Sequence, residues 1–258
     1  QQLNLSRYKV PSGELTNAPL LWAFAKSGRP LILSTGMAEM DEIEFALAVV
    51  HHAQTHDQPP ANKDELLGAW PGTEQAVSGA LAGKVSLLHC TSDYPAAPQA
   101  VNLRAMDHMT EVFGLPVGYS DHTAGIAVSL AAVARGATII EKHFTLDRAL
   151  PGPDHKASLT VPELTQMVAG IRAVSASLGD GIKRPQAVEL ATRELVRQRI
   201  IAVRDLPAGH IITTDDVRTA RSSTGLFAAD YWDCIGARLT KAVGAGMPIV
   251  SIQKEGTK

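Results

Sequence analysis

Two motifs of the sequence place a histidine beside other reactive side chains. GYSDHTAG contains Ser120 and His122, and IEKHFT contains Glu141 and His143. Each motif follows an apolar run typical of a strand, and residues two apart on a strand share a face. If the two strands are neighbours in a barrel, both histidines converge at its carboxyl end, where barrel active sites are built. Such a pair could bind a divalent metal that also holds a substrate oxygen. The alternative is that both are hydrogen-bonded histidines that bind no ligand.

Three other expected strand ends carry hydroxyl groups. KVPSGE contains Lys9 and Ser12, LSTGM contains Ser34, and HCTSDYP contains Ser92 and Tyr94. Lysine and hydroxyl donors beside free backbone N–H groups bind phosphate or carboxylate groups. One such turn alone is an ordinary strand–helix connection, but binding loops gather on one face of a barrel. With the histidines, these residues favour a small anionic substrate.

A long loop, LDRALPGPDHKASL, follows the second histidine motif. Its prolines make it stiff, and Asp154 and His155 lie at its tip. The loop is interpreted equally well as a solvated charged segment or as a third part of the site. The sequence has no P-loop and no G-x-G-x-x-G motif. Neither Cys90 nor Cys234 is paired convincingly with a catalytic histidine, which disfavours a cysteine nucleophile.

The residues between these motifs predict alternating strands and helices. Strands are expected at 5–10, 30–34, 84–90, 115–120 and 137–144, and helices at 17–27, 38–53, 99–113, 125–135 and 161–178. Short apolar strands are typical of a parallel sheet buried on both faces, and repeated strand–helix units favour an α/β fold. The segment 54–83, which is rich in proline and glycine, is expected to be a surface insertion.

The residue pattern of the sequence changes towards its end and indicates a second domain. Residues 1–179 form the expected α/β domain, 180–198 form a polar linker, and 199–258 form a small β-rich module. Within that module, apolar residues alternate on both sides of Pro207–Gly209, which predicts a hairpin that turns there.

Composition excludes several classes of protein. The chain has 258 residues, of which 45% are hydrophobic and 19% charged, a globular composition. With 24 Lys and Arg against 26 Asp and Glu, no basic surplus favours nucleic acid. No apolar run approaches the ~18 residues of a membrane span, and the first residues do not read as a signal peptide. Two distant cysteines exclude a disulfide framework and fit the cytoplasm.

Taken together and in order, these motifs resemble the sialic acid synthase family. The module at the end resembles the antifreeze-like SAF (β-clip) domain of those enzymes, and the resemblance covers the chain except 54–83. It implies a TIM-type (β/α)8 barrel, of which only the last five βα units are readable. Five strands cannot close that barrel, and the family's first three strands, which carry a catalytic Glu, a Lys and a Gln, have no counterpart. A fragment or a truncated gene product is therefore expected.

The resemblance also implies a reaction. Carbon 3 of phosphoenolpyruvate attacks the open-chain aldehyde of N-acetylmannosamine or a related 6-deoxy-diacetamido sugar, water adds at carbon 2, and phosphate leaves by C–O cleavage. The product is a sialic acid, or legionaminic or pseudaminic acid in close relatives. The family forms cytoplasmic, domain-swapped homodimers.

Several functional residues of the family fall on positions of this sequence. A divalent ion, Mn²⁺ with Mg²⁺ or Co²⁺ as alternatives, would be bound by His122 and His143. The resemblance places phosphoenolpyruvate contacts on Lys9, Ser12, Ser34 and Ser120, with Ser92 where many members have Asn. It places sugar contacts on Tyr94, Asp154 and, from the partner's end module, Arg221, whose usual Arg-Pro-Gly motif reads Arg-Ser-Ser. Glu141 is a candidate acid–base residue or a structural carboxylate.

Two other functions remain open on the sequence alone. The missing strands are compatible with a non-catalytic sugar-binding or assembly protein. The two histidines are compatible with a metal-dependent barrel hydrolase, although the anion-binding hydroxyls disfavour it. Phosphate release from both substrates together, lost with a chelator, separates the synthase from both alternatives.

Overall fold

A computed structural model describes residues 5–254 of the chain. The chain divides into two compact units, Gln1–Gly181 and Ile182–Lys258. Each unit has its own buried core. Within the described residues, no helix is both long enough and apolar enough to cross a membrane.

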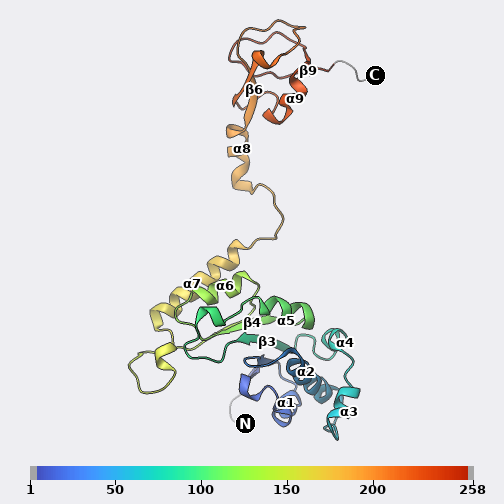
Figure 1. Ribbon diagram of the computed structural model, residues 1–258, viewed down its shortest axis with the longest axis vertical. Coiled ribbons are helices and arrows are strands. Elements are labelled where there is room, and N and C mark those ends of the chain that lie inside the picture. The colour runs from blue at the N-terminus through green and yellow to red at the C-terminus, as the bar shows by residue number, and fades with distance from the viewer. Residues whose placement is uncertain (1–4, 255–258) are drawn as a thin grey trace. The chain divides into compact units, whose positions relative to one another are not determined.

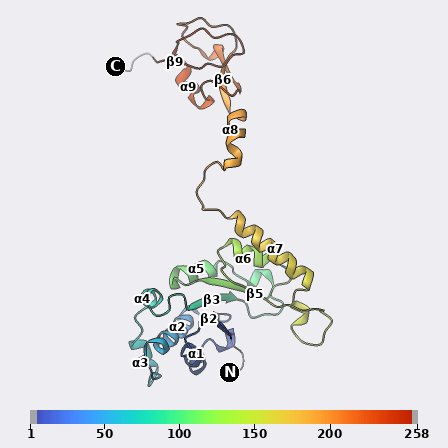
Figure 2. The same ribbon diagram turned by 180° about the vertical axis from the view of Figure 1, so that it is seen from behind.

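The first unit is built on a parallel sheet whose strands follow chain order (Figures 1 and 2). The strands are β1 (Tyr8–Val10), β2 (Leu31–Ser34), β3 (Val85–Cys90), β4 (Val117–Asp121) and β5 (Ile140–Lys142). All adjacent pairs are parallel. The five expected parallel strands are therefore present, as an open half-barrel within the part of the chain that the structure describes. Parallel strands end at the same edge of a sheet, so the motifs after them meet there.

Helices connect the strands and bury their apolar sides against the sheet. They are α1 (Ala18–Ala25), α2 (Met40–Thr55), α5 (Ala105–Phe113) and α6 (Ala127–Ala134). Helix α7 (Val161–Ser177) follows β5 and packs against α6. Their ends are marked by local chemistry: the Asn17 side chain caps α1, and Thr160 and Glu163 form a capping box on α7. Short 3₁₀ turns lie at Ser12–Glu14, Pro98–Ala100 and His155–Ala157.

Segment 54–83 is not a simple surface insertion. It contains α3 (Lys63–Gly68) and α4 (Thr73–Ser78). Leu66, Ala76 and Leu81 are buried and belong to the core of the first unit. The proline and glycine content of the segment marks its turns, but it does not show that apolar residues between those turns pack inward.

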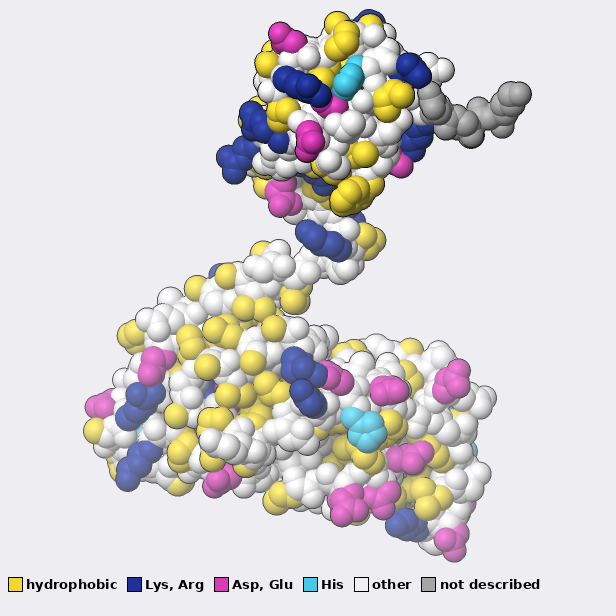
Figure 3. Space-filling view, turned by 45° about the horizontal axis from the view of Figure 1, so that its top comes forward, with side chains coloured by type: hydrophobic (Ala, Val, Ile, Leu, Met, Phe, Trp, Pro, Cys, Tyr) yellow, Lys and Arg dark blue, Asp and Glu magenta, His cyan; other side chains and the backbone are white. Residues whose placement is uncertain are grey.

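Large hydrophobic side chains also remain exposed on the first unit. Met37, Leu146, Val161 and Leu178 are among them. Figure 3 shows hydrophobic side chains gathered on one of its faces. An open sheet leaves apolar surface that a closed barrel would bury.

The second unit is small and rich in short strands. It contains α8 (Leu190–Val196), β6 (Gln198–Ala202), β7 (Val217–Arg221), α9 (Tyr231–Cys234), β8 (Arg238–Leu239) and β9 (Ile252–Gln253). Its 3₁₀ turns lie at Ala187–Glu189, Thr214–Asp216 and Ala228–Asp230. Helix α8 lies within the stretch expected to be a linker.

The expected hairpin about Pro207–Gly209 is wrong. Strand β6 pairs antiparallel with β7 instead. Leu206 exchanges backbone hydrogen bonds with Val243, and Ile212 donates to the carbonyl of Ala237. Alternation shows which side chains are buried but not which segment is the partner, and burial of Leu206 and Ile212 in the second core selects a distant one.

A buried carboxylate organises the second unit and makes it sensitive to acid. Asp216 is fully buried and accepts hydrogen bonds from Thr213, Arg204 and His210. The bond from His210 is the main reason that the pKa of Asp216 lies well below its usual range, although burial opposes the shift. Because the folded-state pKa is depressed, this stabilisation is present above the ordinary carboxyl pKa of about 4 and is lost as the pH falls further.

We expect Asp216→Asn to lower the unfolding midpoint of this unit at pH 7 by at least about 4 °C. The difference from the wild type should shrink as the pH falls from 5 towards 2. Calorimetry across that range measures both effects. A difference that stays constant with pH would show that the charge of Asp216 is not the stabilising feature.

Candidate active site

A cavity of about 380 Å³ lies at the carboxyl ends of the five strands. Expected site residues line it: Lys9, Ser12, Ser34, Ser92, Tyr94, Ser120, His122, Glu141 and His143. Pro11, Gly13, Met37 and Cys90 complete the lining. Residues from all five strand ends are thus brought to one place. A larger cavity of about 500 Å³ adjoins it and shares Met37, Cys90 and Ser92.

One side of the cavity presents donors for an anion. Lys9 Nζ lies 3.3 Å from Glu141 Oε1, and Ser120 Oγ donates to the same oxygen at 2.8 Å. Ser34 Oγ is buried and has no hydrogen-bond partner among residues 5–254. A buried hydroxyl without a partner costs about 1–3 kcal/mol, so a bound ligand or water that accepts from Ser34 is favoured.

Gly36, which the motif analysis did not single out, packs tightly against this donor group. Its N–H donates to Ser12 Oγ at 3.0 Å, and Ser12 Oγ lies 3.1 Å from Cys90 Sγ. A Cβ at position 36 would lie 2.5 Å from Ser92 Oγ and 2.8 Å from both Cys90 Sγ and Ser12 Oγ. Only hydrogen therefore fits at this position without moving the neighbouring side chains. The glycine in LSTGM is a signal of a close approach, but it does not show which side chains approach.

We expect Gly36→Ala to raise the KM for the anionic substrate by about tenfold or more, because displaced serine hydroxyls no longer meet it. The KM for the second substrate should change less. Steady-state kinetics with each substrate varied in turn measures both. Gly68→Ala is the matched control, because its added Cβ meets no atom within 4 Å; equal kinetic effects in the two variants would contradict this role of Gly36.

The opposite side of the cavity holds the two histidines. Their ring centroids lie 5.4 Å apart, and the Tyr94 ring lies 4.2 Å from His122 and 5.6 Å from His143. His122 Nδ1 lies 2.6 Å from the carbonyl oxygen of Thr91, which can only accept, so Nδ1 carries the proton. Nε2 is therefore unprotonated, and it lies 3.4 Å from Ser120 Oγ. Burial lowers the pKa of His122, the Thr91 carbonyl opposes that effect, and His143 adds to it. His122 is therefore a neutral imidazole near pH 7.

This histidine pair fits a divalent metal with open coordination positions. A second hydrogen bond that fixes the tautomer, as Thr91 does for His122, is typical of metal-ligating histidines. Within residues 5–254, however, no three His, Cys, Asp or Glu side chains form a metal-binding group. The chain therefore offers two imidazoles, and water or substrate oxygens must complete the coordination, as in catalytic sites.

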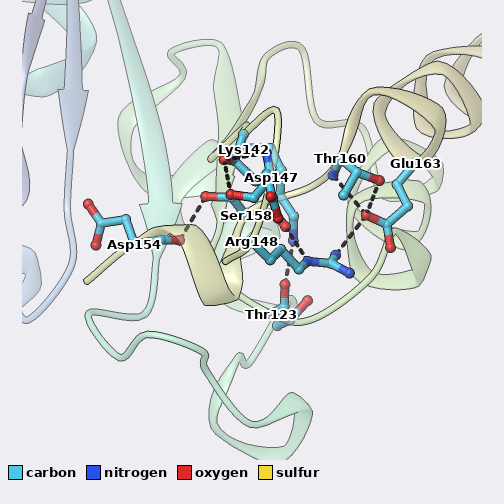
Figure 4. A network of polar contacts seen from close by, with 9 residues as sticks. Thr123, Lys142, Asp147, Arg148, Asp154, Ser158, Thr160 and Glu163 are labelled. Atoms are coloured by element: carbon cyan, nitrogen blue, oxygen red, sulfur yellow. Dashed lines mark hydrogen bonds and ion pairs between the residues drawn. The ribbon is translucent and has the colours of Figure 1, made fainter. Parts of the chain in front are cut away.

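The loop after β5 brings a carboxylate to the histidines. Asp154 Oδ2 lies 3.9 Å from His143 Nδ1. Arg148 holds this loop, because it donates to the Ser158 carbonyl at 3.0 Å and to Glu163 at 2.7 Å (Figure 4). Hydrogen bonds from Thr160, assisted by Arg148, lower the pKa of Glu163 to about 2. The loop is thus tied to the start of α7, with Asp154 near the cavity.

Arg221 is the expected site residue that the first unit does not contain. It is exposed at the end of β7 in the second unit. Asp121 and Lys142, which lie beside the histidines in sequence, do not line the cavity.

Known proteins resemble this chain in sequence along both units. Residues 1–183 match the NeuB family, and residues 197–250 match the SAF domain. An N,N'-diacetyllegionaminic acid synthase of Campylobacter jejuni is 42% identical over 93% of this chain and 64% of its own length. A second N,N'-diacetyllegionaminic acid synthase, from Legionella pneumophila, is 40% identical over 96% of this chain and 63% of its own length.

A solved structure shows the same fold. It is an N-acetylneuraminic acid synthetase of Leptospira borgpetersenii in complex with citrate, with a TM-score of 0.59 and 34% identity. The alignment covers 74% of this chain and 57% of that one. The chain therefore spans less than two thirds of the length of these relatives. The match over residues 1–183 and the module that follows show that the chain belongs to the NeuB family and carries a SAF domain.

Proposed function

We propose that the protein containing this chain condenses phosphoenolpyruvate with an N-acetylmannosamine-type sugar and water, giving a nonulosonic acid and phosphate. The observation that carries the proposal is one cavity with an anion-binding side and an imidazole side. Lys9 and the unpartnered hydroxyl of Ser34 lie on the first, and His122 and His143 lie on the second. An anion and a neutral carbonyl compound need these two environments next to each other.

Phosphoenolpyruvate would lie against the donors of the cavity. The Lys9 ammonium group offsets its negative charge, and the hydroxyls of Ser12 and Ser34 donate to its carboxylate and phosphate oxygens. Ser120 contacts it as well, and donates to it when its hydroxyl turns away from Glu141. Hydroxyl and ammonium donors held on strand ends need little reorganisation to hold the substrate in one orientation.

The reaction forms one carbon–carbon bond and breaks one carbon–oxygen bond. Carbon 3 of phosphoenolpyruvate attacks the aldehyde carbon, whose oxygen takes up a proton as it becomes a hydroxyl. Water adds to carbon 2 and loses one proton, which balances the proton taken up by the aldehyde oxygen. Phosphate then departs with the bridging oxygen and takes up the second proton of the added water, leaving a ketone. In this proposal Glu141, whose Oε1 accepts from Ser120, takes a proton from the water.

His122 and His143 would hold the divalent ion. When bound, such an ion polarises a carbonyl oxygen. The protein's own part is to keep His122 neutral through burial and to fix the proton on Nδ1 through the bond to Thr91, so that Nε2 is unprotonated.

The sugar would lie above phosphoenolpyruvate. Tyr94 and Asp154 contact its hydroxyl groups, and Arg221 of a second copy of the chain donates to the carbonyl of its N-acetyl group. This assignment makes a domain-swapped homodimer the active form.

A diacetamido sugar is the second candidate substrate. The two relatives that are 42% and 40% identical carry the name N,N'-diacetyllegionaminic acid synthase. The larger cavity beside the site supports this candidate, because its lining of Thr35, Met37, Asn102, Met109 and their neighbours has no acidic side chain, lysine or arginine. A neutral amide substituent fits such a lining. Competition between the two sugars at equal concentration decides between them.

The test of the proposed function is phosphate release by the full-length protein. We expect release only when phosphoenolpyruvate and the sugar are both present, and loss of release with a chelator. Metal-dependent hydrolysis that needs no phosphoenolpyruvate would support the hydrolase instead. Sugar binding without release under any metal would support a non-catalytic protein.

A further inference from the structure

A buried ion pair joins β4 and β5 behind the cavity. Asp121 and Lys142 are direct register partners, and Lys142 Nζ lies 3.0 Å from Asp121 Oδ2. The side chains are 0% and 2% exposed. Each residue immediately precedes one of the two cavity histidines, and alternation along the strand turns it to the other face of the sheet. The ion pair therefore lies outside the cavity, but each of its two residues is bonded through the backbone to one of the two cavity histidines.

The Asp121 carboxylate has a partner for each of its lone-pair directions. Oδ1 accepts from the backbone N–H and the hydroxyl of Thr123, both at 2.8 Å. Oδ2 accepts from Ser129 Oγ on α6 at 2.6 Å, in addition to Lys142. Lys142 Nζ also donates to the carbonyl of Thr123 (Figure 4). The turn after β4 is thus held by β5 and by α6.

The same turn is held from the β3 side. Thr123 forms a bridge with Ala96, and the N–H of Ala96 donates to the His122 carbonyl at 2.9 Å. His122 Nδ1 lies 2.6 Å from the Thr91 carbonyl. The backbone of His122 is therefore fixed between the loop after β3 and the ion pair, and a shift of its strand end would break the bond that sets its tautomer.

Packing alone does not require charges at this place. Removing two charged groups from water costs free energy that their attraction repays only in a well-matched geometry. Apolar side chains of similar volume would fill the space between β4, β5 and α6 at least as well. The charged pair fixes the position of the two strand ends relative to each other, because its hydrogen bonds are satisfied in only one arrangement of β4 and β5.

We infer that Asp121 and Lys142 are positioning residues for the two cavity histidines. The pair holds the ends of β4 and β5 so that the rings of His122 and His143 lie edge to face, 5.4 Å apart, with Nε2 of His122 unprotonated. The inference rests on the proposed function only where it concerns metal affinity. The orientation of His122 concerns this chain alone.

The experiment compares Asp121→Asn with a matched variant, Asp216→Asn, in the full-length protein. Asp216 is equally buried and likewise accepts from the backbone and hydroxyl of a nearby threonine, but it lies in the second unit. We measure Mn²⁺ affinity by electron paramagnetic resonance of the free ion. We also determine the His122 tautomer in the metal-free protein from its imidazole ¹⁵N shifts.

We expect Asp121→Asn to weaken Mn²⁺ binding by about 10–100-fold, the usual effect of losing a partner behind a metal ligand. His122 should change from a single Nδ1–H tautomer to a mixture. Asp216→Asn should keep the tautomer and bind Mn²⁺ within about twofold of the wild type. Ser129→Ala removes one bond to Asp121 without removing a charge, so it should give an intermediate loss and keeps the test valid if Asp121→Asn fails to fold.

A loss of thermal stability with unchanged tautomer and Mn²⁺ affinity in both Asp121→Asn and Ser129→Ala would overturn the inference. If the wild type binds no Mn²⁺ but the tautomer still changes in Asp121→Asn, the positioning role stands while the metal part of the proposed function fails. The two failures are thus distinguished.

Discussion

Replacing His143 by alanine is expected to lower metal-dependent turnover by more than about a hundredfold, because only two imidazoles of the described site face an incoming ion. Loss of one leaves His122 as the single protein ligand. Phosphate release measured against Mn²⁺ concentration should show lower turnover and also a higher metal requirement.

The control for this variant is His51→Ala. His51 lies on α2, where its ring contacts Trp70 and does not line the cavity. We expect its turnover to stay within about twofold of the wild type. Undiminished activity in His143→Ala would remove His143 from the metal site and leave it as an ordinary polar residue.

Replacing Arg221 by alanine is expected to raise the KM for the sugar far more than that for phosphoenolpyruvate. A hydrogen bond from a charged donor contributes about 1.5–3 kcal/mol, which corresponds to a sugar KM about 10–100-fold higher. Arg218→Ala is the matched control, because Arg218 is exposed on the same strand, β7, and three residues away on the opposite face. Equal increases in both KM values would contradict the sugar contact.

The same variant tests whether Arg221 acts across a dimer. Neither His143→Ala nor Arg221→Ala alone contains an intact site under the proposed assignment. A mixed dimer of the two variants has one site with a normal His143 and an Arg221 from its partner. Mixing and refolding should therefore restore part of the activity, whereas an arginine that acts within its own chain restores none.

The sequence predicts the sheet well because its signals there are local. Apolar runs such as 30–34 and 84–90 must be buried on both faces wherever they lie, and the strands found are Leu31–Ser34 and Val85–Cys90. Parallel strand ends then necessarily share an edge. This is why the convergence of His122 and His143 could be expected although they belong to two separate motifs of the sequence.

What the sequence could not predict depends on partners that are distant in the chain. Alternation on both sides of Pro207–Gly209 suggested a hairpin, but the strands found other partners. Gly36 is confined by Cys90 and Ser92, which no local pattern links to it. Asp121 and Lys142 were each visible next to a histidine, yet only the register of β4 and β5 shows that they form a pair.

In the proposed reaction, carbon 2 of phosphoenolpyruvate loses its bridging oxygen as phosphate leaves. The most direct test supplies the full-length protein and the sugar with phosphoenolpyruvate that carries ¹⁸O in the bridging position. ³¹P nuclear magnetic resonance then reads the isotope content of the released phosphate. We expect one ¹⁸O in every phosphate, because the C–O bond breaks. Unlabelled phosphate, with the ¹⁸O left on the organic product, would mean that the P–O bond breaks and that the cavity catalyses a different reaction.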